Sequence, residues 1–311
     1  MKFNSFSAAL CAILTAITVT DAGAQESFRL ARPGAPPPSP QGQAAPVPQM
    51  PSSSVQQSQE VSTQASPSLS ASAASNRPIE LRVEKQSNTV KLNASELAEL
   101  GRHDIVLIVD KSESMKAVDC PSIMQPGYLV SRWDWCGQQA FDLAQQASQV
   151  LPEGLGVVIF SNFTRAFPHI SAQEIPTIFS SNRPGGMTNE AAAVDVVLQD
   201  YFSRRKQEHG KVRPMLIAVI TDGLPTNPMA LKRDLVEATQ QMKRKDELSF
   251  IFLQVGSDPE GINFIRDLDQ NLMRANAKFD IVASKTFPDL VRTGLAKVLV
   301  DSIEATGDSN N

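Results

Sequence analysis

The feature that most constrains the fold is a regular alternation of two kinds of segment after Gly101. Short runs made almost entirely of apolar residues alternate with longer segments in which apolar residues recur every three or four positions. The apolar runs are residues 105–109, 156–160, 215–220, 250–255 and 279–283. A strand that is apolar on both sides belongs to a sheet covered on both faces. The alternation therefore predicts a doubly wound α/β domain with a mostly parallel central sheet and helices on both faces.

The segments between these runs have helical spacing. They are residues 138–151, 189–202, 230–244, 262–272 and 288–304. In the first of them, the side chains that share one face are Ala140, Phe141, Ala144, Ala147 and Leu151. This is the spacing of a helix that packs on a sheet. Because doubly wound sheets bind ligands at the carboxyl ends of their strands, we expect a site there.

Residues 1–24 resemble a secretory signal. They combine Lys2, an apolar stretch and the small residues of the sequence AGA, which predicts cleavage before Gln25. The apolar stretch is shorter than the about 20 residues that a membrane-spanning helix needs, and an uncleaved anchor is the alternative. Cleavage predicts an extracytoplasmic protein, periplasmic or secreted, with no membrane span.

Four further segments follow the signal. Residues 25–77 are rich in Pro, Ser, Gln and Ala and cannot bury enough apolar surface to offset the entropy of ordering, which predicts a disordered linker. Residues 79–92 alternate apolar and polar side chains on both sides of a Ser-Asn turn, which predicts a hairpin, and residues 78–100 comprise this hairpin and a lead-in. The main domain is predicted over residues 101–305, and a disordered tail over residues 306–311.

Polar side chains stand where the fold class predicts a site. Asp110, Ser112 and Ser114 directly follow the first apolar run, Thr188 opens a predicted helix after two glycines, and Asp222 follows the run at 215–220. Carboxylates and hydroxyls without His or Cys are hard oxygen donors. Such donors favour Mg²⁺, Mn²⁺ or Ca²⁺ over zinc.

With Thr188 and Asp222 at these places, the D-x-S-x-S sequence resembles the metal-ion-dependent adhesion site of von Willebrand factor type A domains. The resemblance covers about residues 102–304. The segments PGGMTNEAA, VITDGLPT and FLQVGSDPEGINFIRDLDQNL are most similar to the bacterial and fungal branch of stand-alone domains. The resemblance implies the same α/β fold and a bound Mg²⁺, with Mn²⁺ or Ca²⁺ as alternatives.

The resemblance also implies roles for the five residues. Ser112, Ser114 and Thr188 bind the cation directly, while Asp110 and Asp222 hold it mainly through water, and a Glu or Asp of a partner protein completes the coordination. The expected function is an exported adhesion or scaffolding module that binds a protein ligand through the ion. The alternatives are an accessory subunit or regulator of an enzyme or assembly complex that uses the same site, and an ion that only fixes the loops.

Glu113 departs from the family pattern, because Gly is common between the two serines in this branch. Its carboxylate either points to solvent or leans over the ion. In the second case it would discourage an acidic partner, or shift the ion preference towards Ca²⁺.

The segment 117–137 holds further candidate residues. Tyr128, Trp133 and Trp135 lie beside the predicted metal loop and suggest a partner-binding surface, the alternative being that Trp133 only covers the start of a helix. Cys120 and Cys136 are close in sequence in a chain expected to be exported, which predicts a disulfide worth roughly 3 kcal/mol, with two free thiols as the alternative.

Two function classes find no support in the sequence. The net charge of −4 provides no basic surface for nucleic acid. The chain also contains no H-E-x-x-H, G-x-S-x-G or phosphate-binding Gly-Lys sequence, and its three histidines lie in unrelated contexts. We therefore expect a binding protein and not an enzyme.

Overall fold

The computed structural model describes residues 89–308, with side chains described up to residue 303. In chain order the strands are β1 (Asp104–Asp110), β2 (Val118–Pro121), β3 (Leu129–Ser131), β4 (Leu155–Phe160), β5 (Thr164–Ile170), β6 (Met215–Thr221), β7 (Leu248–Gln254) and β8 (Val282–Lys285). The helices are α2 (Ala94–Leu100), α3 (Arg132–Ala147), α4 (Ile175–Ser181), α5 (Glu190–Gln207), α6 (Pro228–Gln241), α7 (Pro259–Asn271), α8 (Phe287–Thr293) and α9 (Leu295–Asp308). Three short 3-10 turns are η1 (Glu113–Lys116), η2 (Lys245–Glu247) and η3 (Met273–Ala275).

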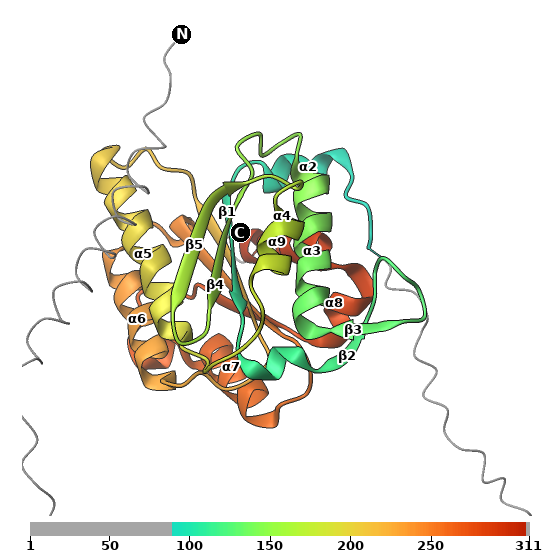
Figure 1. Cartoon of the computed structure of the whole chain (residues 1–311). Helices are drawn as coiled ribbons and strands as arrows, with labels where there is room; N and C mark the ends of the chain where they lie inside the picture. The colour runs from blue at the N-terminus through green and yellow to red at the C-terminus, as the bar shows by residue number, and fades with distance from the viewer. Residues whose placement is uncertain (1–88, 309–311) are drawn as a thin grey trace, which may run out of the picture. The chain divides into compact units, whose positions relative to one another are not determined.

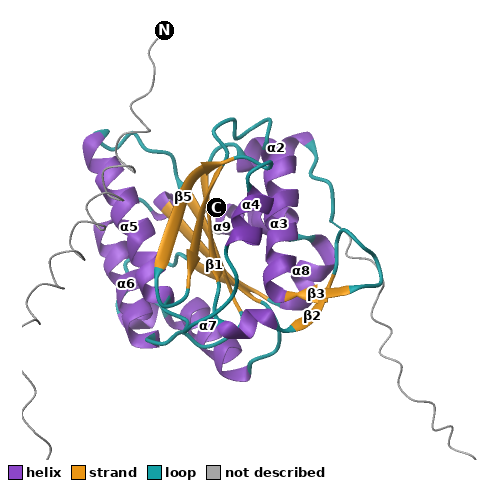
Figure 2. Cartoon of the chain, in the orientation of Figure 1, coloured by secondary structure: helices purple, strands orange, loops and turns teal. Residues whose placement is uncertain are grey.

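Within residues 89–308, six strands form one sheet in the order β5-β4-β1-β6-β7-β8 (Figure 2). All neighbouring strands in it are parallel except β5, which pairs antiparallel with β4 at one edge. The strands β2 and β3 form a separate antiparallel hairpin. The predicted doubly wound α/β fold with a mostly parallel sheet is confirmed.

Two apolar cores cover the two faces of the sheet. In β1, Leu107 and Val109 face the core that includes α3 and α9, while Ile108 faces the core that includes α5 and α6. Figure 1 shows α5 and α6 on one side of the sheet and α3, α4 and α9 on the other. Each large side chain buried in this way stabilises the fold by about 1.5–3 kcal/mol. Both faces are therefore sealed, and the strands are held rigidly up to their carboxyl ends.

The loops at the carboxyl ends of the strands lead into helices with defined first residues. Asn227 accepts a hydrogen bond from the Ala230 amide of α6 at 3.0 Å, and Asp258 accepts one from the Gly261 amide of α7 at 2.7 Å. Such caps satisfy amides that the helix itself leaves unpaired. They fix where each loop ends and keep the loops short.

The structure differs from the sequence-based expectations in several segments. The edge strand β5 and the helix α4 were not predicted; β5 contains Arg165 and Pro168 and lacks an apolar run, which only an edge strand tolerates. The last predicted helix is divided into α8 and α9 by Gly294, whose φ is 81°. The last predicted strand begins three residues later, at Val282.

The ends of the predicted domain also differ. Residues 89–93 form no strand, and the helix α2, capped by Asn93, follows them. The remainder of the predicted hairpin, the signal at 1–24 and the linker at 25–77 lie outside the described residues. At the other end α9 continues to Asp308, past the predicted domain end at residue 305.

The turn before β4 requires glycine at position 154. Gly154 has a φ of 79°, and an added Cβ would overlap the carbonyl of Ile170 at the end of β5. We expect Gly154→Ala to lower the free energy of unfolding by at least about 2 kcal/mol, because backbone strain and overpacking add. Gly210→Ala is the control: its φ is 84° but nothing lies within 4 Å of the added Cβ. Urea unfolding of the full chain should show the smaller loss for Gly210→Ala, and equal losses would contradict the packing argument.

Candidate metal centre

Asp110 lies at the carboxyl end of β1 and is fully buried. Its Oδ1 accepts a hydrogen bond from the Ser112 amide at 2.6 Å, and its Oδ2 accepts one from the Thr221 hydroxyl at 3.0 Å. Thr221 is the last residue of β6, the neighbouring parallel strand. Both carboxylate oxygens are therefore held in place by the two central strands.

A chain of hydrogen bonds runs outward from this buried position. The hydroxyls of Ser112 and Ser114 are 3.0 Å apart, and the Ser114 hydroxyl donates to Asp222 Oδ1 at 2.8 Å. Ser112 and Asp222 are buried, whereas Ser114 is exposed. Adjacent ligands of an octahedral ion with metal–oxygen distances of about 2.1 Å are separated by about 3 Å. The two hydroxyls thus have the spacing that two neighbouring ligands of Mg²⁺ would need.

The loop that contains Thr188 is attached to the first metal loop through backbone hydrogen bonds. The Gly185 amide donates to the Lys111 carbonyl at 2.8 Å, and the Glu113 amide donates to the Gly186 carbonyl at 3.2 Å. The Thr188 carbonyl accepts from the Thr226 amide at 2.8 Å, which joins it to the loop after Asp222. All three loops that carry predicted metal ligands are therefore connected to one another.

Gly186 explains why glycine precedes Thr188. Its φ is 93°, and an added Cβ would lie 2.8 Å from Asn162 Oδ1. That oxygen accepts a hydrogen bond from the Met187 amide at 2.7 Å. The glycine lets the Thr188 loop approach the turn after β4.

Sequence analysis missed Arg132, the first residue of α3. Its Nη1 donates to Asp222 Oδ2 at 2.8 Å, and its Nε and Nη2 donate to the Asp119 carboxylate at 3.0 and 2.6 Å. The guanidinium lies against Gly256, where an added Cβ would be 2.6 Å from its Cζ. No local sequence signal pairs an arginine with an aspartate 90 residues later. Arg132 therefore binds Oδ2 of Asp222, while Ser114 donates to Oδ1.

Sequence analysis also missed Glu190, two residues after Thr188. Its side chain is 1% exposed, and its Oε1 has no hydrogen-bond partner in the structure. Burial, and secondarily the charge of Asp110, raises the pKa of Glu190 well above its usual range. A glutamate followed by small apolar residues on a helix face that must pack on the sheet was the available signal. Its carboxyl adds a third acid to this region.

The pKa of Asp110 is raised to about 6, chiefly by burial and in smaller part by Asp222. Its hydrogen bonds from Ser112 and Thr221 oppose this increase. A divalent cation would reverse the effect, because a nearby positive charge favours the ionised carboxylate.

The remaining predicted partner-binding residues occupy different environments. The Glu113 carboxylate binds Lys116 Nζ at 2.6 Å and its side chain is 66% exposed. Tyr128 is 67% exposed, in the loop between β2 and β3. Trp133 and Trp135 are 2% and 1% exposed. The prediction that the two indoles belong to a partner-binding surface is therefore wrong, because both lie in the core.

The two indoles are buried because they complete the packing around α3. Trp133 Nε1 donates to the Phe179 carbonyl at 3.0 Å, and its ring centroid is 4.5 Å from that of Phe179. Trp135 packs edge-on against Phe287, with centroids 5.2 Å apart. The helix α3 is thereby joined to α4 and α8.

The predicted disulfide is also corrected, since Cys120 and Cys136 are free thiols in the structure. Both are fully buried in the core that includes α3. Burial raises the pKa of both thiols, and Asp119 raises that of Cys120 further. Both cysteines thus act as small apolar core residues in the protonated form.

The donor set fits a hard divalent cation. Its members are Ser112, Ser114, Thr188, Asp110 and Asp222, and all of their side-chain donor atoms are oxygens. Within residues 89–308 no group of three or more His, Cys, Asp or Glu side chains is arranged to hold a metal. The residues that would hold an ion here are mainly hydroxyls, which leave its charge largely uncompensated.

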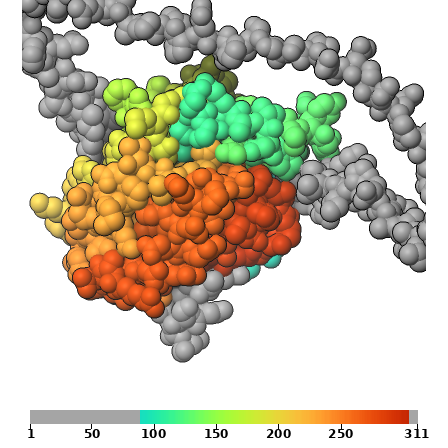
Figure 3. All heavy atoms as spheres, turned by 90° about the horizontal axis from the view of Figure 1, so that it is seen from below, coloured from blue at the N-terminus to red at the C-terminus, as the bar shows by residue number. Residues whose placement is uncertain are grey.

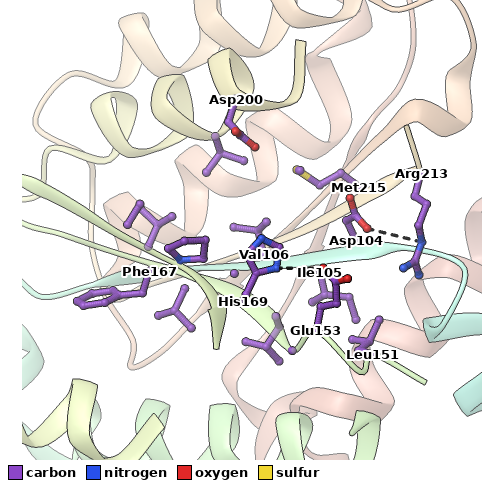
Figure 4. A pocket seen from close by; sticks show the side chains of 18 of the residues that line it. Asp104, Ile105, Val106, Leu151, Glu153, Phe167, His169, Asp200, Arg213 and Met215 are labelled. Atoms are coloured by element: carbon purple, nitrogen blue, oxygen red, sulfur yellow. Dashed lines mark ion pairs between the residues drawn. The ribbon is translucent and has the colours of Figure 1, made fainter. Parts of the chain in front are cut away.

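A pocket of about 300 Å³ lies at the amino ends of the strands, opposite the end that carries the predicted metal ligands (Figure 4). It is lined by the first residues of β1, β4 and β6 and by α5, and most of its lining is apolar. Asp104 at its rim is 3.1 Å from Arg204 Nη1 and 3.6 Å from Arg213 Nε. None of the residues predicted for the metal site contributes to this pocket.

In residues 89–308 no helix has the length and apolar character needed to cross a membrane.

No family model matches the chain, and no curated protein matches its sequence. A comparison with solved structures finds partial similarities at low identity. Manganese-loaded TRAP protein of Plasmodium vivax is 14% identical, with a TM-score of 0.40 over 61% of this chain and 70% of that one. The PilB minor pilin of Streptococcus sanguinis is 11% identical, with a TM-score of 0.40 over 67% of this chain and 61% of that one.

A third similar structure is proximal thread matrix protein 1 of the mussel byssus, with a zinc-occupied adhesion-site motif. It is 16% identical, with a TM-score of 0.43 over 64% of this chain and 47% of that one. The chain thus matches less than two thirds of the length of the pilin and about half of that of the byssus protein. Identities and TM-scores this low support no conclusion about this chain.

The pKa of Asp110 leads to a pH-dependent effect of Asp110→Asn in chelator. The folded chain holds the Asp110 proton more tightly than the unfolded chain, so wild-type stability falls as the pH rises from about 4 through 6. Relative to the wild type, Asp110→Asn should gain on the order of 2 to 3 kcal/mol between pH 4 and pH 7.5. Urea unfolding at both pH values measures this gain. Glu237→Gln, at a side chain 65% exposed, should show no such gain, and an equal gain there would contradict the prediction.

Arg132 is expected to contribute to stability through Asp222. Arg132→Met leaves the buried Asp222 carboxylate without its cation, which should cost about 3–5 kcal/mol in chelator at neutral pH. Adding Asp222→Asn should recover part of that loss, because no buried charge is then left unpaired. Arg292→Met is the control, since Arg292 is 70% exposed in its ion pair with Asp289 and should change stability by less than about 0.5 kcal/mol. A double variant no more stable than Arg132→Met would contradict the pairing.

Proposed function

We propose, for a chain with the fold of a von Willebrand factor type A domain, that it binds protein partners through a divalent cation. Ser112, Ser114 and Thr188 would bind the ion directly, and Asp110 and Asp222 would hold it mainly through water. Mg²⁺ is the expected ion, with Mn²⁺ or Ca²⁺ as alternatives. The observation that carries the proposal is the hydrogen-bonded chain from Ser112 through Ser114 to Asp222, beside the fixed carboxylate of Asp110.

The hydrogen bonds of the hydroxyls support this assignment. Ser114 donates its proton to Asp222, so its oxygen accepts the Ser112 hydroxyl proton on one lone pair and keeps the other for a cation. Arg132 binds the other oxygen of Asp222, which keeps that carboxylate from turning towards the ion and neutralising it. An ion bound by hydroxyls and water keeps much of its charge, and a carboxylate from another protein is the strongest available ligand for it.

Glu113 is the residue of this chain whose carboxylate could compete with a partner's acid for the ion. Its carboxylate is paired with Lys116, three residues later in η1, and is largely exposed. The sequence left two orientations of the Glu113 carboxylate open, and this pairing supports the one in which it points to solvent. The approach to the ion is then open to an acidic side chain from outside.

The setting of this binding activity is a further part of the proposal. The secretory signal predicted at residues 1–24 supports an extracytoplasmic location, and the linker predicted at 25–77 would precede the binding domain as a tether. An adhesion or scaffolding role follows from that setting, and no catalytic step is part of it.

Calorimetric titration of Mg²⁺, Mn²⁺ and Ca²⁺ into the chelator-treated full chain tests the metal site. We expect one ion per chain, no binding by Asp110→Ala, and at least tenfold weaker binding by Thr188→Ala. Glu113→Gly should change the affinity less than threefold, because its carboxylate is already paired with Lys116. Thr177→Ala, on an exposed residue of α4, is the control. Binding that survives in Asp110→Ala would place the ion elsewhere, and no binding by the folded wild type would reject the site.

Selection of displayed peptides tests the carboxylate. Random linear peptides on phage are bound to the immobilised full chain in Mg²⁺ and eluted with chelator. The eluted pool should be enriched in Asp and Glu, and replacing the acid of a selected peptide by its amide should abolish binding. Eluted peptides without acids would contradict the proposed function, as would equal recovery on Asp110→Ala.

A further inference from the structure

Exposed large apolar side chains are unevenly distributed over the described part of the molecule. In residues 89–303 they are Val90, Val118, Met124, Tyr128, Leu129, Phe163, Met187, Leu224, Met229 and Met273. Single exposed apolar side chains are normal on soluble proteins. Eight of these ten, however, lie in segments next to the predicted metal ligands or in the hairpin that follows η1, and only Val90 and Met273 lie elsewhere.

Four of the eight form what we call the apolar rim: Phe163, Met187, Leu224 and Met229. Phe163 is in the turn after β4, Met187 directly precedes Thr188, Leu224 is two residues after Asp222, and Met229 is in the first turn of α6. Their exposed fractions are 83%, 59%, 37% and 75% in the same order. Each therefore belongs to a loop, or to the helix start after it, at the carboxyl ends of the strands.

Hydrogen bonds join the loops that carry the rim. The Met187 amide donates to Asn162 Oδ1, next to Phe163. The Thr226 amide, two residues after Leu224, donates to the Thr188 carbonyl. The rim is thus connected to the ligand loops on both sides of Thr188, and a partner that reaches the ion on this side meets apolar side chains.

The other four side chains form the hairpin patch: Val118, Met124, Tyr128 and Leu129. They belong to β2, β3 and the loop between them, and their exposed fractions are 62%, 58%, 67% and 52% in that order. The hairpin is connected to the metal site through Asp119, which binds Arg132, which in turn binds Asp222. In Figure 3 the blue-green segment that follows β1 lies between the yellow-green and orange segments and the protruding green hairpin. The apolar rim is therefore connected to the loop of Thr188, and the hairpin patch is connected to Asp222.

We propose that the partner is a protein segment whose Asp or Glu is flanked by large apolar residues, with the carboxylate on the ion and the flanking side chains on the apolar rim and the hairpin patch. This inference rests on the proposed function and specifies its partner. The charge of the ion selects the acid. The two apolar groups contribute affinity that an isolated acid lacks, because burial of apolar area stabilises an interface while exposed charges contribute little.

The composition of the surface specifies the partner further. Three of its eight side chains are methionines, which are flexible and adapt to differently shaped apolar groups. Phe163 provides a large rigid contact area in the apolar rim, and Tyr128 provides one in the hairpin patch. Such a surface suits partners that share an acid with apolar neighbours and differ otherwise in sequence.

The peptide selection described above tests this inference when the residues around the acid are counted. We expect the chelator-eluted peptides to carry large apolar residues within about four positions of the acid, above their frequency in the starting library. The variant Phe163→Ser/Met187→Ser/Met229→Ser should bind a selected peptide at least tenfold more weakly, measured by calorimetry in Mg²⁺. Its Mg²⁺ affinity should stay within twofold of the wild type, since none of these three side chains is a predicted ligand.

The matched control is Val90→Ser/Met273→Ser, which removes the two exposed apolar side chains that lie elsewhere and should leave peptide binding unchanged. Acidic, chelator-sensitive peptides with polar neighbours would overturn the inference while the proposed function stands, as would unchanged binding by the triple variant. Apolar peptides without an acid that bind in chelator would contradict both. So would a selection that returns no chelator-sensitive peptide.

Discussion

The parallel pairing of β1 with β6 is the constraint on which the rest of the site depends. In this register Val109 lies opposite Ile220, so Asp110 and Thr221 end their strands side by side and Asp222 follows immediately. Two carboxylates more than a hundred residues apart in sequence therefore meet at one edge of the sheet. Both faces of the sheet are sealed by apolar cores, so the strand ends cannot shift without disturbing helix packing. The relative positions of Asp110 and Asp222 are thus fixed by the sheet.

The electrostatics of the site are unfavourable without a cation. Asp110, Asp222 and Glu190 are all nearly inaccessible to water, and burial raises the pKa of Asp110 and Glu190. Arg132 compensates only part of this acidity, and it also holds Asp119. A divalent cation would offset the repulsion between these carboxyls. On the proposed function, the ion would make several buried acids at one place favourable and would stabilise the loops that carry them.

The segment 117–137, which runs from the end of η1 into the start of α3, contains buried and exposed side chains with different surroundings. Its buried side chains, which include both tryptophans and both cysteines, hold α3 against α4 and α8 and fill the core. Its exposed side chains lie in the hairpin and make no comparable contacts. Arg132 lies at the boundary between these two parts, at the start of α3, and connects the hairpin to Asp222 through Asp119. The proposed partner surface is therefore fixed to the metal site by charged hydrogen bonds.

The sequence by itself determined the alternation of buried strands and amphipathic helices, and with it the fold class and the loops that carry the predicted ligands Asp110, Ser112, Ser114, Thr188 and Asp222. These features depend on local spacing and on the rule that parallel strands end together. Only the tertiary structure decided that Trp133, Trp135, Cys120 and Cys136 are core residues, that Arg132 binds Asp222, and that Oε1 of Glu190 is buried without a hydrogen bond. Burial and long-range ion pairs depend on which surfaces meet after folding, and the sequence pattern around one residue does not contain that information.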